Sequence, residues 1–182
     1  MPTWGSSTGP NPARVPGVIE MELVGVRLEQ PSNTPLVLLR ETSGQRRVLP
    51  IFIGGPEATA IAFALDGVVT PRPMTHDLMK AILEDLNASV QRILVTHLSD
   101  EGTFFAEIHL HAPDGDHQIS SRPSDAIALA VRVGSPIFAN EAVVEQGATT
   151  METESDDDNE SEDVVEQFRE FIDSVNPEDF AS

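Results

Sequence analysis

The hydrophobic pattern at the start of the chain is that of β-strands. Aliphatic and β-branched residues come in short runs, separated by turn-forming residues such as Ser43 and Gly44. Runs of this kind, bounded by Gly, Pro, Asn and Ser, are typical of strands. The runs are residues 18–29, 35–41 and 46–53. We therefore predict three strands in this part of the chain.

Two segments then carry apolar residues at helical spacing. The first, residues 55–67, is rich in alanine, and the second spans residues 75–87. Residues three and four apart lie on one face of a helix. The apolar face of the first helix consists of Ala58, Ile61, Ala62 and Leu65, and that of the second of Leu78, Met79, Ile82, Leu83 and Leu86. We expect both faces to pack against the rest of the protein.

Strand-like segments return at residues 89–98 and 103–112, and a shorter one follows at 116–121. The dipeptide Asp114-Gly115 before the last segment is a frequent two-residue hairpin loop. With that loop, the opposing pairs are Leu110 with Ile119, His111 with Gln118 and His109 with Ser120. We predict this register because apolar residues then face apolar residues.

The next segment, residues 124–134, is apolar on nearly every side, which indicates a buried helix. Residues 135–140 have the pattern of a last short strand. Runs of strands interrupted by a few helices are typical of α+β domains. The sequence predicts an α+β fold with a mostly antiparallel sheet and about three packed helices.

The charge of the chain is unevenly distributed. The formal net charge is -19, and residues 151–182 carry most of it. Residues 1–17 are rich in Pro, Gly, Ser and Thr, and residues 148–160 are acidic, so neither segment can form a core of its own. We expect a disordered leader at 1–17, a folded domain at 18–147 and an acidic linker at 148–160. The acidity opposes broad coating of nucleic acid but permits a local phosphate site, because salt screens charges beyond about 8 Å.

The last segment, residues 161–182, has the pattern of a short amphipathic helix. Ser161 stands where an N-cap belongs, and Pro177 follows the end of the pattern. The apolar stripe consists of Val164, Val165, Phe168, Phe171, Ile172 and Val175. Such a stripe needs a partner. The helix either folds back on the domain or docks on another protein.

The composition excludes several classes of protein. The chain has no cysteine, which removes thiol catalysis, Cys-ligated zinc and disulfides. No apolar stretch approaches the roughly 18 to 20 residues of a membrane span. The first residues lack the apolar centre of a secretory signal. We predict a cytoplasmic protein without a membrane partner.

Two of the predicted helices begin with similar residues: Arg-Pro, then a hydroxyl residue and an aspartate. In the first, Thr75 is placed to cap the helix. In the second, either Ser124 is the cap, or Pro123 takes the first helical position and Asp125 the third. Capping alone is a sufficient reason for these residues, with no function attached.

The arginine ahead of each helix start is not explained by capping. Free N–H groups at the start of a helix bind anions, and a neighbouring arginine strengthens such a site. The sequence therefore indicates a phosphate cradle, whose candidate ligands are Arg72, Thr75, Arg122 and Ser124.

Several stretches resemble the bifunctional nuclease domain family, whose members are described as cutting both DNA and RNA. The stretches are LPIFIGGPEATAIAFALDG, RPMTHDLMKAILEDLNA, GTFFAEIHL and SSRPSDAIALAVRVGSPIF, within residues 20–147. The residues that match the motifs of the family are Glu57, Arg72, Thr75, His76, Asp77, Arg122, Ser124 and Asp125. The chain departs from the pattern at Gly55-Pro56 and at His97, where an acid is common. The resemblance implies an α+β fold, a homo-oligomer of two or more chains, and nuclease activity.

Cleavage of a phosphodiester needs an activated nucleophile, a stabilised phosphate charge and help for the leaving group. Arg72 and Arg122 can stabilise the charge, and His76 can act as general acid or base. The carboxylates that can activate water or hold a divalent cation such as Mg²⁺ are Glu57, Asp77 and Asp125.

The sequence EIHLH offers a second constellation. In a strand, Glu107, His109 and His111 lie on one face, which is a possible arrangement for a transition metal. The alternative is the solvated face of an antiparallel strand. His117 is expected on the opposite face and would not join the three.

Two functions follow from these observations. The first is a nuclease that hydrolyses phosphodiester bonds of DNA and RNA, with nucleic acid as its substrate. The second is a non-catalytic regulatory or adaptor protein that binds a partner through its acidic C-terminal tail.

Overall fold

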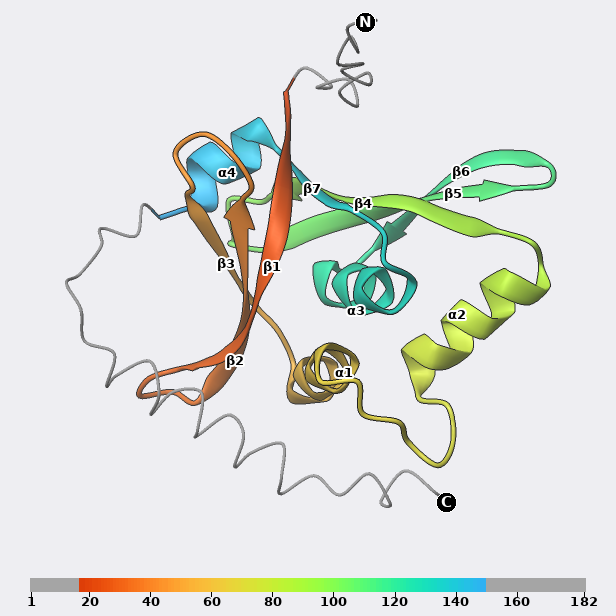
Figure 1. The fold of residues 1–182 in the computed structure, drawn as a ribbon. Helices are drawn as coiled ribbons and strands as arrows, with labels where there is room; N and C mark the ends of the chain where they lie inside the picture. The colour runs from red at the N-terminus through yellow and green to blue at the C-terminus, as the bar shows by residue number, and fades with distance from the viewer. Residues whose placement is uncertain (1–16, 150–182) are drawn as a thin grey trace, which may run out of the picture.

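The structure is a computed structural model that describes residues 17–149 (Figure 1). The strands of these residues are β1 Val18–Glu29, β2 Thr34–Glu41, β3 Val48–Phe52, β4 Ser89–Leu98, β5 Phe104–Ala112, β6 Gly115–Ser121 and β7 Ile137–Asn140. Their helices are α1 Gly55–Leu65, α2 Thr75–Asp85, α3 Pro123–Val133 and α4 Glu141–Gly147.

The strands form one sheet in the order β3-β2-β1-β7-β4-β5-β6. Neighbours are antiparallel except for β7 and β4, which run parallel. The last strand along the described chain, β7, thus lies in the middle of the sheet and joins the β1–β3 half to the β4–β6 half (Figure 1). The prediction of an α+β fold with a mostly antiparallel sheet is confirmed.

Helix α3 lies at the centre of the core. No residue from 126 to 130 is more than 1 % exposed. The helix contacts β4 and β5 on the sheet, and both α1 and α2 contact it from the other side (Figure 1). A helix enclosed in this way can place polar groups only at its ends, because an unpaired polar group in a core is costly. The polar ends of α3 therefore form the candidate site described below.

Helix α4 was not among the predicted elements. Its seven residues are too few to establish a helical period. Val143 and Val144 are buried in the core. At its end, Gly147 is so close to Leu49 and Phe104 that a Cβ atom would lie 3.0 to 3.3 Å from their side chains. The described residues thus contain four helices, where the sequence predicted about three.

The predicted register of the β5–β6 hairpin is wrong by two residues. Ala112 pairs with Gly115, so Pro113 and Asp114 form the loop. The observed pairs include Ile108 with Ile119, His109 with Gln118 and His111 with Asp116. Proline suits a loop because it has no N–H for the ladder, and Gly115 adopts a φ of 132° that other residues rarely reach. A shift of two residues leaves each side chain on its predicted face.

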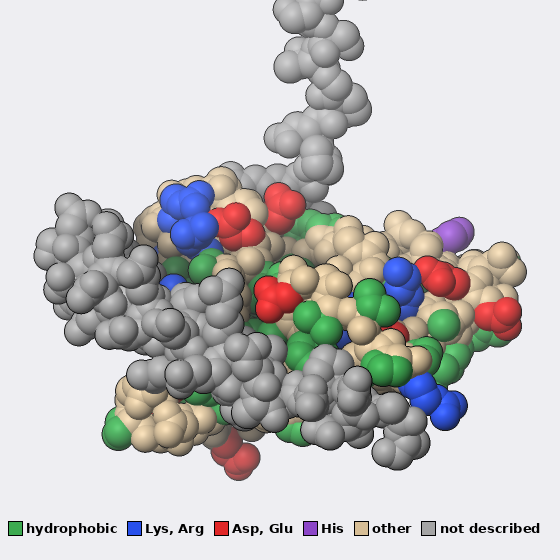
Figure 2. All heavy atoms as spheres, turned by 60° about the horizontal axis from the view of Figure 1, so that its bottom comes forward, with side chains coloured by type: hydrophobic (Ala, Val, Ile, Leu, Met, Phe, Trp, Pro, Cys, Tyr) green, Lys and Arg blue, Asp and Glu red, His purple; other side chains and the backbone are tan. Residues whose placement is uncertain are grey.

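The predicted apolar faces of α1 and α2 are buried only in part. Met79 and Leu83 of α2 pack against the core. The exposed members are Leu78 at 53 %, Ile82 at 48 %, Leu86 at 61 % and Leu65 at 47 %. Hydrophobic side chains accordingly reach the surface on the side of the molecule that carries α1 and α2 (Figure 2). The expectation that both apolar faces pack is therefore met only in part. Leu65 is the last residue of α1, and Leu78, Ile82 and Leu86 lie outside the stripe of α2 that packs against the core.

Most of the predicted terminal segments lie outside the described residues. These are the leader at 1–17 apart from Gly17, the linker at 148–160 beyond Thr149, and the helix at 161–182. Thr149 itself pairs with Val48 of β3 through backbone hydrogen bonds of 3.0 and 2.9 Å. None of the helices within residues 17–149 has the length and apolar character needed to cross a membrane.

Two isoleucines allow a matched test of this core. Ile127 in α3 is 0 % exposed, whereas Ile82 in α2 is 48 % exposed. We expect Ile127→Ala to lower the free energy of unfolding by about 2 to 5 kcal/mol, because it leaves a cavity. Ile82→Ala should lower it by less than about 1 kcal/mol. Urea unfolding followed by circular dichroism measures both, and equal losses would contradict the central position of α3.

Candidate functional site

The first turns of α1, α2 and α3 share one chemical feature, a carboxylate at the third position. These residues are Glu57, Asp77 and Asp125. A carboxylate there interacts favourably with the free N–H groups and the positive end of the helix dipole. The N-cap residues Gly54, Met74 and Arg122 make no capping hydrogen bond through their own side chains. The side chains that interact with the free N–H groups at these helix starts are therefore the carboxylates at the third positions.

At the start of α3, Arg122 folds back over Asp125. Its Nε donates to Asp125 Oδ2 at 2.7 Å, and its Nη2 donates to Oδ1 at 3.1 Å. Pro123 takes the first helical position, so the second of the two predicted arrangements is confirmed and Ser124 is not the cap. Ser124 is 7 % exposed. The paired hydrogen bonds fix the plane of the guanidinium group.

Arg122 also joins α3 to α1. Its Nη2 donates to Glu57 Oε1 at 2.8 Å. The carboxylate of Glu57 turns back over the start of α1, where its Oε2 would collide with any side chain at Gly54. Glycine at position 54 therefore leaves room for the Glu57 carboxylate to reach Arg122.

His76 joins the same group from α2. Its Nε2 lies 3.1 Å from Asp125 Oδ1, and its side chain is 6 % exposed. Its other ring nitrogen, Nδ1, is buried and has no hydrogen-bond partner within residues 17–149. Glu57, Arg122, Asp125 and His76 thus form a continuous chain of polar contacts across three helices. We call these four residues the helix-start cluster.

Asp77, although next to His76, lies outside the helix-start cluster. One of its oxygens accepts a hydrogen bond from the Met74 backbone N–H at 2.9 Å, and the other accepts one from Arg132 Nε at 2.6 Å. The side chain of Arg132 is only 7 % exposed. Asp77 therefore closes the start of α2 and pairs with a buried cation at the far end of α3.

The structure does not place Arg72 or Thr75 in the helix-start cluster. Thr75 is the first residue of α2 and is exposed, and the N-cap is Met74, so the prediction that Thr75 caps this helix is wrong. Arg72 is exposed, and its guanidinium makes no hydrogen bond or ion pair with any residue between 17 and 149. Of the two predicted phosphate-binding arginines, Arg122 is therefore the one that lies among the candidate catalytic residues.

The ionic state of the helix-start cluster follows from its contacts. Burial raises the pKa of Asp125, but hydrogen bonds from Arg122 and His76 outweigh burial and hold this pKa below its ordinary value of 3.8. The hydrogen bonds to Asp125 and Glu57 raise the pKa of Arg122. Asp125 is thus an anion and Arg122 a cation throughout the physiological pH range. The Arg122 side chain is 65 % exposed, so the cation faces solvent.

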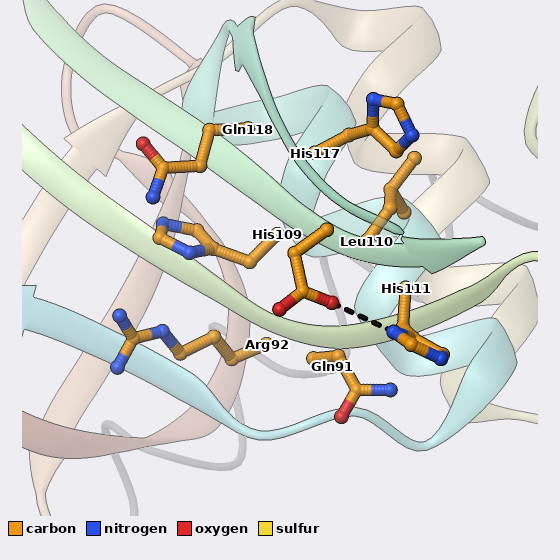
Figure 3. Close-up of a pocket in the computed structure, with 8 residues that line it drawn as sticks. Gln91, Arg92, His109, Leu110, His111, His117 and Gln118 are labelled. Atoms are coloured by element: carbon orange, nitrogen blue, oxygen red, sulfur yellow. Dashed lines mark hydrogen bonds and ion pairs between the residues drawn. The ribbon is translucent and has the colours of Figure 1, made fainter. Parts of the chain in front are cut away.

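The predicted metal candidates on β5 are arranged differently from a metal site. Glu107 Oε2 lies 3.3 Å from His109 Nε2, within the distance of an ion pair, but the two atoms form no hydrogen bond. His111 points away toward Asp116 of β6 and contacts it at 2.7 Å (Figure 3). Within residues 17–149, no three His, Asp or Glu side chains are grouped so that they could hold a metal ion. The described residues thus offer no group of three ligands, either on β5 or at the helix-start cluster.

The sequence profile of the bifunctional nuclease domain matches residues 37–152, a range that contains the whole helix-start cluster. The chain belongs to the bifunctional nuclease domain family. This confirms the resemblance seen in the sequence. In this member of the family, the motif residues Glu57, His76, Arg122 and Asp125 converge at one place, which their separation along the chain does not reveal.

Relatives of the chain are found in bacteria and plants. A Mycobacterium tuberculosis protein described as uncharacterized is 46 % identical over 164 residues, covering 88 % of this chain and 97 % of that protein. Bifunctional nuclease 2 of Oryza sativa subsp. japonica is 28 % identical over 117 residues, covering 62 % of this chain and 35 % of that protein. Bifunctional nuclease 1 of Arabidopsis thaliana is 28 % identical over 109 residues, covering 58 % of this chain and 33 % of that protein. The similarity to the plant nucleases thus spans about a third of their length.

The pairing of Arg132 with Asp77 was not predicted from the sequence. The place of Arg132 near the end of the predicted helix is a usual one for a cation, which interacts well with the negative end of the dipole. Its pairing with Asp77 joins residues 55 positions apart, and no local pattern encodes such a contact.

The Asp77–Arg132 pair predicts a pH dependence of stability. Burial raises the pKa of Asp77, but hydrogen bonds from Arg132 and the Met74 backbone outweigh burial and lower the pKa from 3.8. The stabilisation is therefore complete above about pH 4 and is lost as the pH falls through the lowered pKa. We expect Asp77→Asn to lower the free energy of unfolding at pH 7 by about 1 to 3 kcal/mol, and the difference from wild type to shrink as the pH falls below about 4.

Glu84→Gln on the same helix is the control for that experiment. Glu84 is 66 % exposed, and its contact with Lys80 is 3.9 Å long. An exposed pair of this kind contributes little, so the control should differ from wild type by less than about 0.5 kcal/mol. A loss in Asp77→Asn that stays constant from pH 7 to pH 3 would show that the ion pair is not its cause.

Proposed function

We propose that this protein hydrolyses phosphodiester bonds of DNA and RNA at the helix-start cluster. The observation that carries the proposal is the exposed, permanently charged guanidinium of Arg122, which two carboxylates hold in a fixed plane. Membership of the bifunctional nuclease domain family supports the reaction class. The names of the plant relatives support it as well.

Arg122 binds the scissile phosphate in this proposal. Its Nε and Nη2 are used by Asp125 and Glu57, whereas Nη1 has no hydrogen-bond partner in the described part of the chain. Nη1 is thus a donor available to a phosphate oxygen. A donor that is fixed in advance stabilises the extra negative charge of the pentavalent transition state without reorganisation.

Glu57 activates the water. Of the four carboxylate oxygens in the helix-start cluster, three contact Arg122 or His76. The fourth, Glu57 Oε2, accepts no hydrogen bond from residues 17–149. The water oxygen forms the new bond to phosphorus and gives its proton to Oε2, while the leaving oxygen departs and takes a proton from solvent.

His76 is a positioning residue in this proposal, not an acid or base in contact with the substrate. Its ring is buried, and Nε2 faces Asp125. By holding Oδ1 of Asp125, it keeps that carboxylate turned toward Arg122. The cation of the proposed site is the guanidinium of Arg122, which lies between the carboxylates of Glu57 and Asp125.

Arg122→Ala and Glu57→Gln test the proposed roles. Each is expected to lower kcat on single-stranded DNA and RNA by about 100-fold, the usual effect of losing a charge-stabilising donor or a general base. Arg122→Lys should recover only part of the rate, because an ammonium group cannot replace the planar fork. Arg46→Ala is the control, since Arg46 is exposed and pairs with Glu22 away from the cluster.

All variants are purified in parallel, so that a contaminating nuclease appears equally in each. A rate in Arg122→Ala and Glu57→Gln that equals the rate of wild type and of Arg46→Ala would refute the proposed site.

Chelation tests the assignment of the cation. We expect excess EDTA to change the cleavage rate by less than about twofold, because Arg122 supplies the positive charge at the phosphate. Wild type is assayed with EDTA and again after Mg²⁺ is restored. Complete loss in EDTA with recovery in Mg²⁺ would contradict the arrangement proposed here.

A further inference from the structure

The sheet carries a hollow on strands β4, β5 and β6. The hollow measures about 730 Å³, which is within the range of about 300 to 1,000 Å³ for sites that hold small molecules. Side chains of β5 alternate between two faces, with Ile108 and Leu110 directed to the core and His109 and His111 directed away from it. The hollow thus offers its polar wall on the face of the sheet opposite α3.

One cross-strand row forms the centre of the hollow. Arg92 of β4 lies opposite His109 of β5, and His109 lies opposite Gln118 of β6. Side chains opposite each other on neighbouring strands are about 5 Å apart at Cβ. Figure 3 shows the three side chains next to one another on the same side of the strands. A guanidinium, an imidazole and a carboxamide therefore face one space.

Arg92 is a cation without a counter-ion in the described structure. The arginines paired with carboxylates are Arg40, Arg46, Arg47, Arg122 and Arg132. Arg92 contacts no carboxylate within residues 17–149, and its guanidinium instead lies 5.9 Å above the ring of Phe138. In a chain with a net charge of -19, an unpaired arginine in a hollow is a place for an anion.

His109 has an unmet hydrogen bond in the same row. Its side chain is 14 % exposed, and its Nε2 is buried without a hydrogen-bond partner among the described residues, although Glu107 Oε2 lies 3.3 Å away. Buried polar atoms normally have a partner in the protein, in water or in a ligand. Asp116, which also lines the hollow, contacts His111 at 2.7 Å, and this contact is drawn as a dashed line in Figure 3.

We infer that this hollow is a subsite for one nucleotide unit of the nucleic-acid strand, an inference that rests on the proposed function. Arg92 binds its phosphate, and the carboxamides of Gln118 and Gln91 bind the edge of its base. Gln118 is four residues before Arg122, which is about 13 Å along an extended strand. Because β6 is the edge strand of the sheet, the nucleic acid passes from the hollow along this edge to Arg122.

Binding of a single strand tests the subsite without cleavage. A fluorescein-labelled oligouridylate of about twelve nucleotides, with phosphorothioate linkages that resist hydrolysis, is titrated with the full chain from roughly 50 to 200 mM salt. Arg92→Ala is expected to raise Kd about tenfold and to reduce the slope of log K against log salt by about 1, because one phosphate contact is lost.

Gln118→Ala separates base recognition from charge. It is expected to raise Kd several-fold with the salt slope unchanged, because it removes a neutral contact. Arg27→Ala is the matched control, since Arg27 on β1 also lacks a carboxylate partner in the described chain but does not line the hollow. Its Kd should stay within about twofold of wild type. In cleavage assays, Arg92→Ala should raise KM and leave kcat unchanged, because Arg92 contributes only to binding. Arg122→Ala should lower kcat.

The outcomes of these experiments separate the proposed subsite from the proposed hydrolytic function. An unchanged Kd and salt slope in Arg92→Ala overturn the subsite, whether or not the protein cleaves. A wild-type protein that binds the strand through Arg92 but never cleaves it overturns the hydrolytic function and supports the subsite. If uridine monophosphate displaces the probe no better than inorganic phosphate, the hollow accepts any anion and the nucleotide assignment is overturned.

Discussion

The burial of the middle of α3, residues 126–130, is the constraint on which the site depends. Its middle is enclosed by the sheet and by two other helices, so its polar residues are confined to the two ends. At the start, Asp125 meets His76, and at the end, Arg132 meets Asp77. Asp125 and Arg132 are seven residues apart, about 10 Å along the axis. Two adjacent residues of α2 thus hold α3 at two points, and the same packing places a fixed cation at the surface.

The distribution of charge is compatible with the proposed site for a polyanion in an acidic chain. Carboxylates at the third positions of the helices interact with the helix dipoles, and Glu57 and Asp125 also fix an arginine beside them. At physiological salt, charge beyond about 8 Å is screened, so the local cations at Arg122 and Arg92 matter more than the total. Both arginines lie on the β4–β6 half of the sheet. Arg122 directly follows the edge strand β6, and Arg92 lies in the hollow on the face opposite α3.

Most of the fold could be predicted from the sequence because its elements carry local signals. The strands and the first three helices follow from period and turn residues, and the buried character of α3 follows from its uniform apolarity. The central position of β7 could not be predicted, since it depends on pairing with β1 and β4 across most of the chain. The predicted hairpin register was wrong because two overlapping dipeptides, Pro113-Asp114 and Asp114-Gly115, both suit a tight loop, and Pro113, which cannot donate to the ladder, favours the first.

The four residues of the helix-start cluster were among the candidates from the sequence, but their arrangement was not predicted, and Arg72, Thr75 and Asp77 lie outside the cluster. Both Arg-Pro motifs resemble phosphate cradles in the sequence, but the first has two more residues between its proline and its aspartate. Arg122 is therefore the N-cap residue, three positions before Asp125, which is the spacing at which helical side chains meet. Arg72 is five positions before Asp77 and lies outside the helix, so Asp77 pairs with Arg132 instead. One motif thus builds an exposed cation and the other a structural clamp, and the difference is the length of the helix entry.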